Sequence, residues 1–104
     1  MAPVYSSRFA GIQGLDGVAG FTVPPGVVWV LRDLDAYYNG FTVASIHLLG
    51  STMQTIWYNG FGGGGNPQYA SWRGRQVLNP GEGFQLTTDQ AIDVTVSGYV
   101  LTLP

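Results

Sequence analysis

The chain has 104 residues, which is room for one core, and we predict a single domain over residues 1–104. Its 45% of hydrophobic and 10% of charged residues exclude disorder. With only four Arg and a net charge of −2, the chain lacks the positive charge that binding to the phosphates of nucleic acid requires. The lack of Cys excludes disulfides and thiolate metal sites, and no apolar run is long enough for membrane insertion. A soluble domain normally carries about a quarter charged residues, so we expect neighbouring subunits to cover much of this surface.

Gly and Pro recur along the whole chain, so a helix of three turns has almost nowhere to form. The longest stretch without either residue, 27–39, is rich in Val, Trp and Tyr, which favour strands. The pattern therefore predicts short strands, with a glycine-rich connection at 11–17 between the first two. They are expected at residues 4–9, 19–23, 27–38, 41–49, 53–58, 69–78, 84–88 and 92–103.

Turn residues stand between these strands. Pro25-Gly26 fits the centre of a type II turn. Asn39-Gly40 fits a type I′ turn, which predicts that 27–38 and 41–49 form a hairpin. Asn59-Gly60 is expected to open a glycine-rich loop that runs to Pro67, and Asn79-Pro80-Gly81 ends the sixth strand.

Residue types alternate in the last predicted strand, which indicates one buried face. That face carries Ile92, Val94, Val96 and Val100, and the polar face carries Asp93, Thr95 and Ser97. Beyond Gly98 the second face also becomes apolar, with Tyr99, Leu101 and Leu103, which indicates a bulge at Gly98 or burial of both faces. In the strand 27–38 the alternation predicts two faces. One carries Val28, Val30, Arg32, Leu34 and Ala36, and the other carries Trp29, Leu31, Asp33 and Asp35.

Seven or eight short antiparallel strands in a chain of this length predict an all-β fold. The favoured architecture is a single antiparallel β-sandwich, with either a jelly-roll or an immunoglobulin-like topology. A small closed barrel is the remaining alternative.

The sequence contains little that could carry catalysis. His47 is the single His, no Gly-x-Ser-x-Gly motif accompanies it, and a half-buried or solvent-facing strand position is its expected role. The run Gly62–Gly65 is followed by no Lys and no helix start, so it fits a flexible loop tip better than a phosphate cradle. We predict no enzymatic activity, no catalytic residue and no cofactor.

Asp33 and Asp35 lie on one face of a strand, about 7 Å apart from the two-residue repeat. That spacing suits calcium or a pair of catalytic carboxylates. An ion pair with Arg32, Arg73 or Arg75 is the favoured interpretation, and we predict no metal site.

Aromatic residues surround both Asn-Gly turns, in Tyr38-Asn39-Gly40-Phe41 and in Tyr58-Asn59-Gly60-Phe61. If the two tips point the same way, they form an aromatic surface that suits a sugar or a protein partner. Arg73 and Arg75 share one strand face with Trp72 opposite, and Arg suits carboxylate pairing across an interface. The candidate interface residues are Tyr38, Phe41, Trp57, Tyr58, Phe61, Trp72, Arg73 and Arg75.

Three segments, 21–33, 70–82 and 93–104, resemble parts of small virion proteins of tailed phages that infect actinobacteria. They follow the family's order and cover about a third of the chain, and each is a strand with its turn. The resemblance implies a small β-sandwich subunit displayed many times on a phage particle, as a minor tail or capsid decoration protein. It implies no catalytic residue.

The predicted function is that of a non-enzymatic structural component located in the virion. A small minor tail protein that forms a symmetric oligomer is favoured, a trimer by analogy with jelly-roll virion modules, and its partners are itself and other virion proteins. One alternative is a capsid decoration protein that stabilises the head. The other is a carbohydrate-binding module for host cell-wall glycans, which requires exposed aromatics beside polar residues such as Asn39, Asn59 and Gln68.

Overall fold

The computed structural model describes residues 4–104, with side chains from Ser7 onward, so residues 1–3 of the predicted domain lie outside it. The strands that it describes are antiparallel, which confirms the all-β prediction. They are β1 (Val4–Thr22), β2 (Val27–Tyr38), β3 (Ala44–Leu49), β4 (Thr55–Phe61), β5 (Gln68–Leu78) and β6 (Gly83–Thr102). One 3-10 turn, η1 (Ser51–Met53), precedes β4, and no helix in this part of the chain could cross a membrane.

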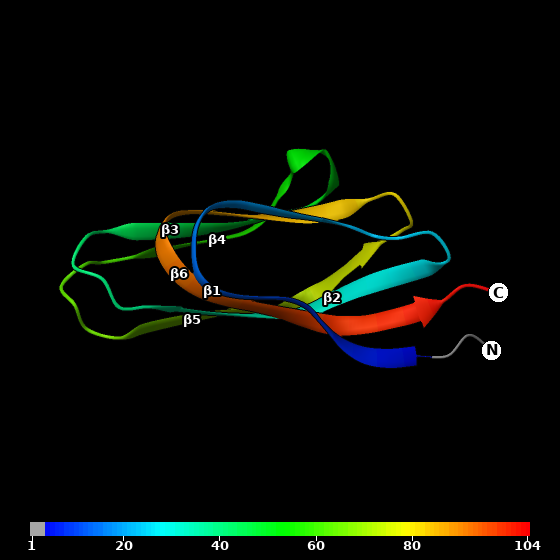
Figure 1. The fold of residues 1–104 in the computed structure, drawn as a ribbon, viewed down its shortest axis with the longest axis horizontal. Helices are drawn as coiled ribbons and strands as arrows, with labels where there is room; N and C mark the ends of the chain where they lie inside the picture. The colour runs from blue at the N-terminus through cyan, green and yellow to red at the C-terminus, as the bar shows by residue number, and fades with distance from the viewer. Residues whose placement is uncertain (1–3) are drawn as a thin grey trace.

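Two long bent strands create the two layers of the sandwich. β1 and β6 pair along their whole length, from Val4 opposite Leu101 to Thr22 opposite Gly83, and both curve over at the same end of the molecule (Figure 1). The C-terminal half of β6 pairs with β2, and its N-terminal half pairs with β3. The lower layer in Figure 1 is therefore ordered β1-β6-β2-β5, and the upper layer is ordered β1-β6-β3-β4.

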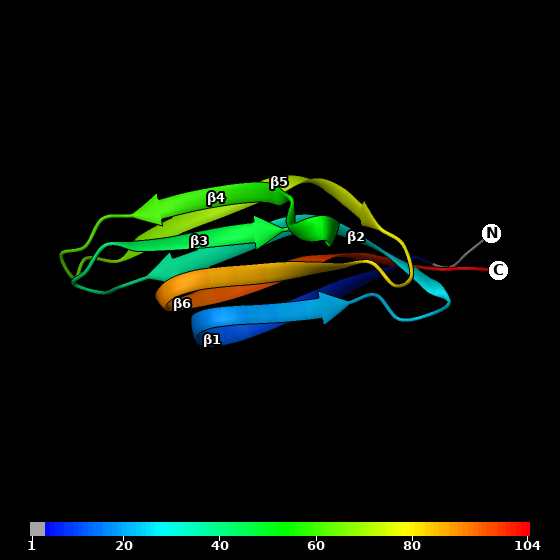
Figure 2. The same cartoon turned by 90° about the horizontal axis from the view of Figure 1, so that it is seen from above.

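The pairing scheme is that of a jelly roll. Strands pair as β1 with β6, β2 with β5, and β3 with β4, so the chain forms one long ribbon. The ribbon rolls up so that β6 lies beside both β2 and β3, as Figure 2 shows from above. Among the described residues no ladder joins β4 to β5, so the sheet stays open and is not a barrel. This topology decides between the two predicted sandwich types.

The predicted hairpin at Asn39-Gly40 is wrong. β2 pairs with β5 and β6, and the segment after Gly40 crosses to the other layer before it enters β3. Asn59-Gly60 lies inside β4, where Gly60 is opposite Ser45. The turn at Pro25-Gly26 keeps its predicted place, since Gly26 has the positive φ of +85° that a type II turn requires.

The predicted connection at 11–17 is a bend within β1. Gly14 and Gly17 have φ of +69° and +118°, and the register with β6 shifts on either side of Leu15. The buried Thr88 hydroxyl holds the bend, because its Oγ1 donates to the Leu15 carbonyl at 2.6 Å and accepts from the Gly17 N–H at 3.2 Å. On the other side of the bend, the Gly14 N–H donates to Asp93 Oδ1 at 2.7 Å.

The core lies between the two layers, and β6 shows the predicted alternation, with Ile92, Val94 and Val96 buried. In β2 the predicted faces are wrong, because Leu31 and Leu34 are both fully buried although they are three residues apart. The register shift against β6 explains this, since Arg32 is an extra residue between Leu31 and Asp33 and so reverses which side chains of β2 face the core.

Gly98 is not itself a bulge. β6 runs on regularly, and the extra residues belong to its neighbours, Phe9 in β1 and Arg32 in β2. The backbone of β2 lies directly against Gly98: a Cβ built there would overlap the Val30 carbonyl oxygen and lie 3.1 Å from the Arg32 nitrogen. A side chain has no room at this position.

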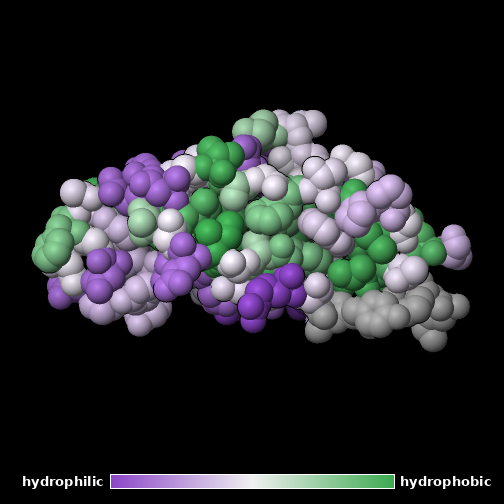
Figure 3. Space-filling view, viewed as in Figure 1, coloured by the Kyte–Doolittle hydropathy of each residue, from purple (hydrophilic) through white to green (hydrophobic). Residues whose placement is uncertain are grey.

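Aromatic residues, most of them partly buried, close the two open sides of the sandwich. Phe9 stacks on Trp29 with ring centroids 4.7 Å apart, and Phe21 stacks on Phe84 at 4.9 Å. Figure 3 shows hydrophobic residues gathered midway between the layers on the face toward the viewer. Trp57 of β4 and Trp72 of β5, on the opposite edge strands, also pack against the core.

Candidate interaction surface

Two of the predicted interface residues are part of the core. Tyr38 and Phe61 are each 3% exposed, and their rings pack together with centroids 5.7 Å apart. The Tyr38 hydroxyl donates to the Thr42 carbonyl oxygen at 2.6 Å. The two aromatic Asn-Gly segments do converge, but they meet through buried rings that offer a partner no surface.

Phe41 and Tyr58 are exposed but lie apart from each other. Phe41 is 85% exposed in the loop between β2 and β3, and its ring covers Gly65 in the loop between β4 and β5. A hydrogen bond of 2.9 Å from the Gly65 N–H to the Gly40 carbonyl joins these loops. Tyr58 is 54% exposed on the outer face of the upper layer, where it packs on His47. The structure therefore forms no single platform from these rings.

Trp57 and Trp72 point inward and are partly buried against the core. Each is paired in register with a fully buried leucine, Trp57 with Leu48 and Trp72 with Leu34. Both residues therefore close the side of the sandwich.

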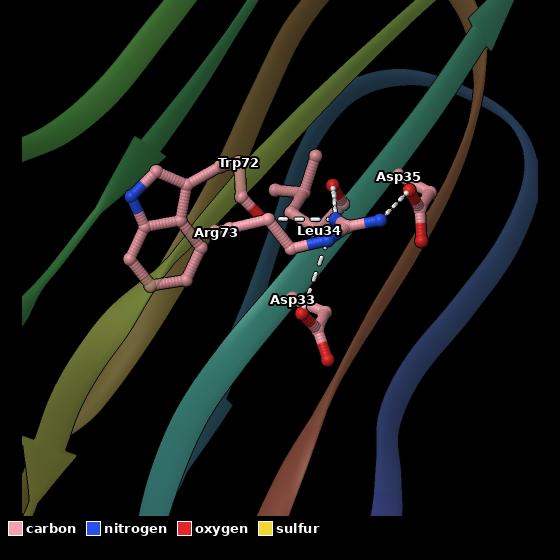
Figure 4. Close-up of polar contacts among 5 residues, drawn as sticks. All are labelled: Asp33, Leu34, Asp35, Trp72 and Arg73. Carbon is pink, nitrogen blue, oxygen red and sulfur yellow. Dashed lines mark hydrogen bonds and ion pairs between the residues drawn. The ribbon is translucent and has the colours of Figure 1, made fainter.

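Arg73 is engaged by the two aspartates of the neighbouring strand (Figure 4). Its Nε lies 3.2 Å from Asp33 Oδ1, its Nη2 lies 2.9 Å from Asp35 Oδ1, and its Nη1 donates to the Leu34 carbonyl at 3.1 Å. The hydrogen bond to Asp35 raises the pKa of Arg73, so the side chain stays charged at every ordinary pH. The predicted ion pair is confirmed, and no three acidic or His side chains of the described chain gather as a metal site would need.

Arg75 lies beside an apolar area on the outer face of the lower layer, which we call the valine–tyrosine patch. It consists of Val30, Val77, Tyr99 and Leu101. Val30 of β2 pairs directly with Val77 of β5 and with Tyr99 of β6, so the side chains form a continuous row across three strands. Val77 is 48% exposed and Tyr99 is 36% exposed.

Two arginines border the patch. The Arg32 guanidinium lies over the Tyr99 ring, 5.6 Å from its centroid, and Arg75 lines the same shallow depression of about 340 Å³. The sequence carried a signal for this surface, since both faces of the last strand become apolar beyond Gly98. In the described structure this second apolar face points to solvent.

No protein-family model matches the chain, and a search of curated proteins found no match. Among solved structures, the chain is similar to the infectious bursal disease virus VP2 subviral particle, with a TM-score of 0.40 and 12% identity over 98% of this chain and 33% of that one. Chains of the Gx strain and of the T13 viral particle of this virus both give a TM-score of 0.37 at 12% identity over 98% of this chain, and over 32% and 31% of theirs. The chain thus spans about a third of the length of those chains, and the likeness concerns the fold alone.

Proposed function

We propose that the protein is a non-enzymatic structural subunit of a tailed-phage virion, a small minor tail protein that assembles as a symmetric oligomer. The valine–tyrosine patch is the observation that carries the proposal. A lone domain would leave this row of apolar side chains in water. A second copy that covers it would gain about 25 cal/mol for each Å² of apolar surface removed from water.

The composition of the patch supports a protein partner. Apolar and aromatic side chains at the centre with Arg at the rim are typical of protein interfaces. Arg75 forms no ion pair within the described chain, so its guanidinium is free to bind a carboxylate of another subunit. By analogy with jelly-roll virion modules, a cyclic trimer is the oligomer that we expect.

The segments that resemble phage virion proteins support the location. Residues 21–33, 70–82 and 93–104 contain the first part of β2, most of β5 and the C-terminal half of β6. These strands are direct neighbours in the lower layer, and they carry every residue of the valine–tyrosine patch. The resemblance is therefore concentrated on the sheet that we assign to assembly.

The oligomer should dissociate when a charge enters the patch. Val77→Glu places a carboxylate on the exposed row of edge strand β5 without touching the core, and burying that charge in an interface is unfavourable. Light scattering after size exclusion should give a multiple of 11.1 kDa for the wild type and 11.1 kDa for Val77→Glu.

Val18→Glu is the matched control. Val18 is 61% exposed on β1 and lies outside the patch, so this variant should keep the wild-type mass. A wild type that is monomeric at high concentration would refute the assembly, and dissociation of both variants would refute the assignment of the patch.

The virion role predicts that the chain copurifies with virus particles. Mass spectrometry of gradient-purified particles should detect it, and antibody labelling in the electron microscope should mark the tail. Labelling of the head would favour the capsid decoration alternative over a tail protein. Its absence from particles would refute both.

A further inference from the structure

A groove of about 470 Å³ crosses the outer face of the lower layer, at the opposite end from the valine–tyrosine patch. We call it the tyrosine groove. Two rows of side chains form it across the sheet: Thr95 of β6 is opposite Asp35 of β2, and Asp93 of β6 is opposite Tyr37 of β2, which is in turn opposite Tyr69 of β5. All of these residues line the groove.

Gly11 makes room for the Arg8 side chain at the edge of the groove. This residue of β1 is opposite Thr95 and has no side chain, and a Cβ there would lie 3.0 Å from Arg8 Cδ. Arg8 therefore lies across Gly11 and borders the groove, while the small exposed Thr95 forms its floor.

A pair of tyrosines forms one wall. The Tyr37 and Tyr69 rings lie 5.0 Å apart at an angle of 51°, and Tyr69 is 77% exposed. A ring that is fixed by a neighbour and open to solvent gives an apolar face on which the C–H face of a sugar ring can stack. Tyr37 restricts the Tyr69 ring, so less side-chain freedom is lost when a ligand binds.

The carboxylates of Asp35 and Asp93 line the groove and can accept hydrogen bonds from a ligand. Asp93 Oδ1 accepts from the Gly14 N–H at 2.7 Å, and Asp35 Oδ1 accepts from Arg73 at 2.9 Å. In each case one oxygen fixes the side chain, and the other, Oδ2, has no hydrogen bond within the described chain. The Arg8 guanidinium and the Thr95 hydroxyl supply donors on the same surface.

The balance of charge selects the ligand. Asp35 and Asp93 balance Arg8 and the Arg73 that pairs with Asp35, so the groove offers no excess positive charge to an anion. Two carboxylates are too few for a calcium site. Hydroxyl groups both donate and accept hydrogen bonds, which matches carboxylates, a guanidinium and a hydroxyl around an aromatic wall.

From these observations we infer that the tyrosine groove binds a neutral oligosaccharide. One sugar ring stacks on Tyr69, and hydroxyls of the same or the next ring donate to Asp35 and Asp93. The inference does not depend on the virion role, because the groove lies within one chain and does not include the valine–tyrosine patch.

Isothermal titration calorimetry with the full chain tests this. The probes are the neutral hexasaccharides of β-glucose, α-glucose, β-mannose and N-acetylglucosamine at millimolar concentration, with a hyaluronan hexasaccharide as the anionic comparison. We expect at least one neutral probe to bind and hyaluronan not to bind. Tyr69→Ala should weaken binding about tenfold or more, and Tyr69→Phe, which keeps the ring, should retain most of the affinity.

Tyr58→Ala is the matched control, since Tyr58 is also an exposed tyrosine of an edge strand, but on the other layer. It should bind as the wild type does, and Thr95→Arg, which fills the floor of the groove, should not bind. Unchanged melting curves will show that the variants fold. The inference is overturned if no neutral hexasaccharide binds, if hyaluronan binds best, or if Tyr69→Ala binds like the wild type. None of these outcomes bears on the mass of Val77→Glu, so the two proposals fail separately.

Discussion

Gly98→Ala is expected to lower the free energy of unfolding by about 3 kcal/mol or more. The added methyl group would overlap the carbonyl oxygen of Val30, which is backbone and cannot rotate away as a side chain would. To make room, β2 must move away from β6, and the ladder at the centre of the lower layer must be distorted there. Urea titration followed by tryptophan fluorescence measures this loss.

Gly20→Ala is the control for the Gly98 variant. Gly20 is an extended strand glycine in β1, and nothing lies within 4 Å of the position of its Cβ. The Ala reduces the freedom of the unfolded chain without a clash, so stability should stay the same or rise by a few tenths of a kcal/mol. Equal losses in the two variants would show that the approach of β2 to Gly98 is not the cause.

Thr88→Val should lower the free energy of unfolding by about 2–4 kcal/mol, because it removes the hydroxyl that holds the bend of β1. The shape of the side chain is kept, but the Leu15 carbonyl and the Gly17 N–H both lose their partner at a site where Thr88 is 5% exposed. Chemical denaturation gives the size of the loss, and amide hydrogen exchange should be faster at Gly17.

Two further variants isolate the hydroxyl. Thr88→Ser keeps it and should lose less stability than Thr88→Val. Thr87→Val changes the next residue of β6, which pairs with the exposed Val18 on the outer face, and should be close to neutral. If Thr87→Val and Thr88→Val are equally stable, the hydroxyl does not hold the bend.

Local patterns predicted the strands well but not their partners. All eight predicted strands overlap strands of the structure, and two pairs of them merge into β1 and β6. Two of them begin too early, since residues 41–43 lie in the loop before β3 and residues 53–54 precede β4. The residue types at Asn39-Gly40 led to the wrong prediction of a hairpin, because a loop that crosses between layers can use the same residues as a hairpin turn. Which strands lie beside β2 depends on β5 and β6, whose paired residues are 30 or more positions away, and no local signal specifies that.

For the candidate surfaces too, local patterns predicted some contacts, and others depended on the pairing of distant strands. The pairing of Arg73 with Asp33 and Asp35 followed from residue types and strand facing, and it is confirmed. Tyr38 was assigned to a surface because it precedes a turn, but the bulge at Arg32 places it on the core side. The tyrosine groove joins residues from four strands, so it could be seen only after the register was known.

The ribbon arrangement also sets an order for folding. The residues that pair in β3 and β4 are near each other in sequence, those of β2 and β5 are farther apart, and those of β1 and β6 are the most distant. Closing a longer loop costs more chain entropy, so pairing should start at the β3–β4 hairpin and proceed outward, at the slow rates of folds with distant contacts. During synthesis β1 emerges before the other five strands and is the last to find its partner.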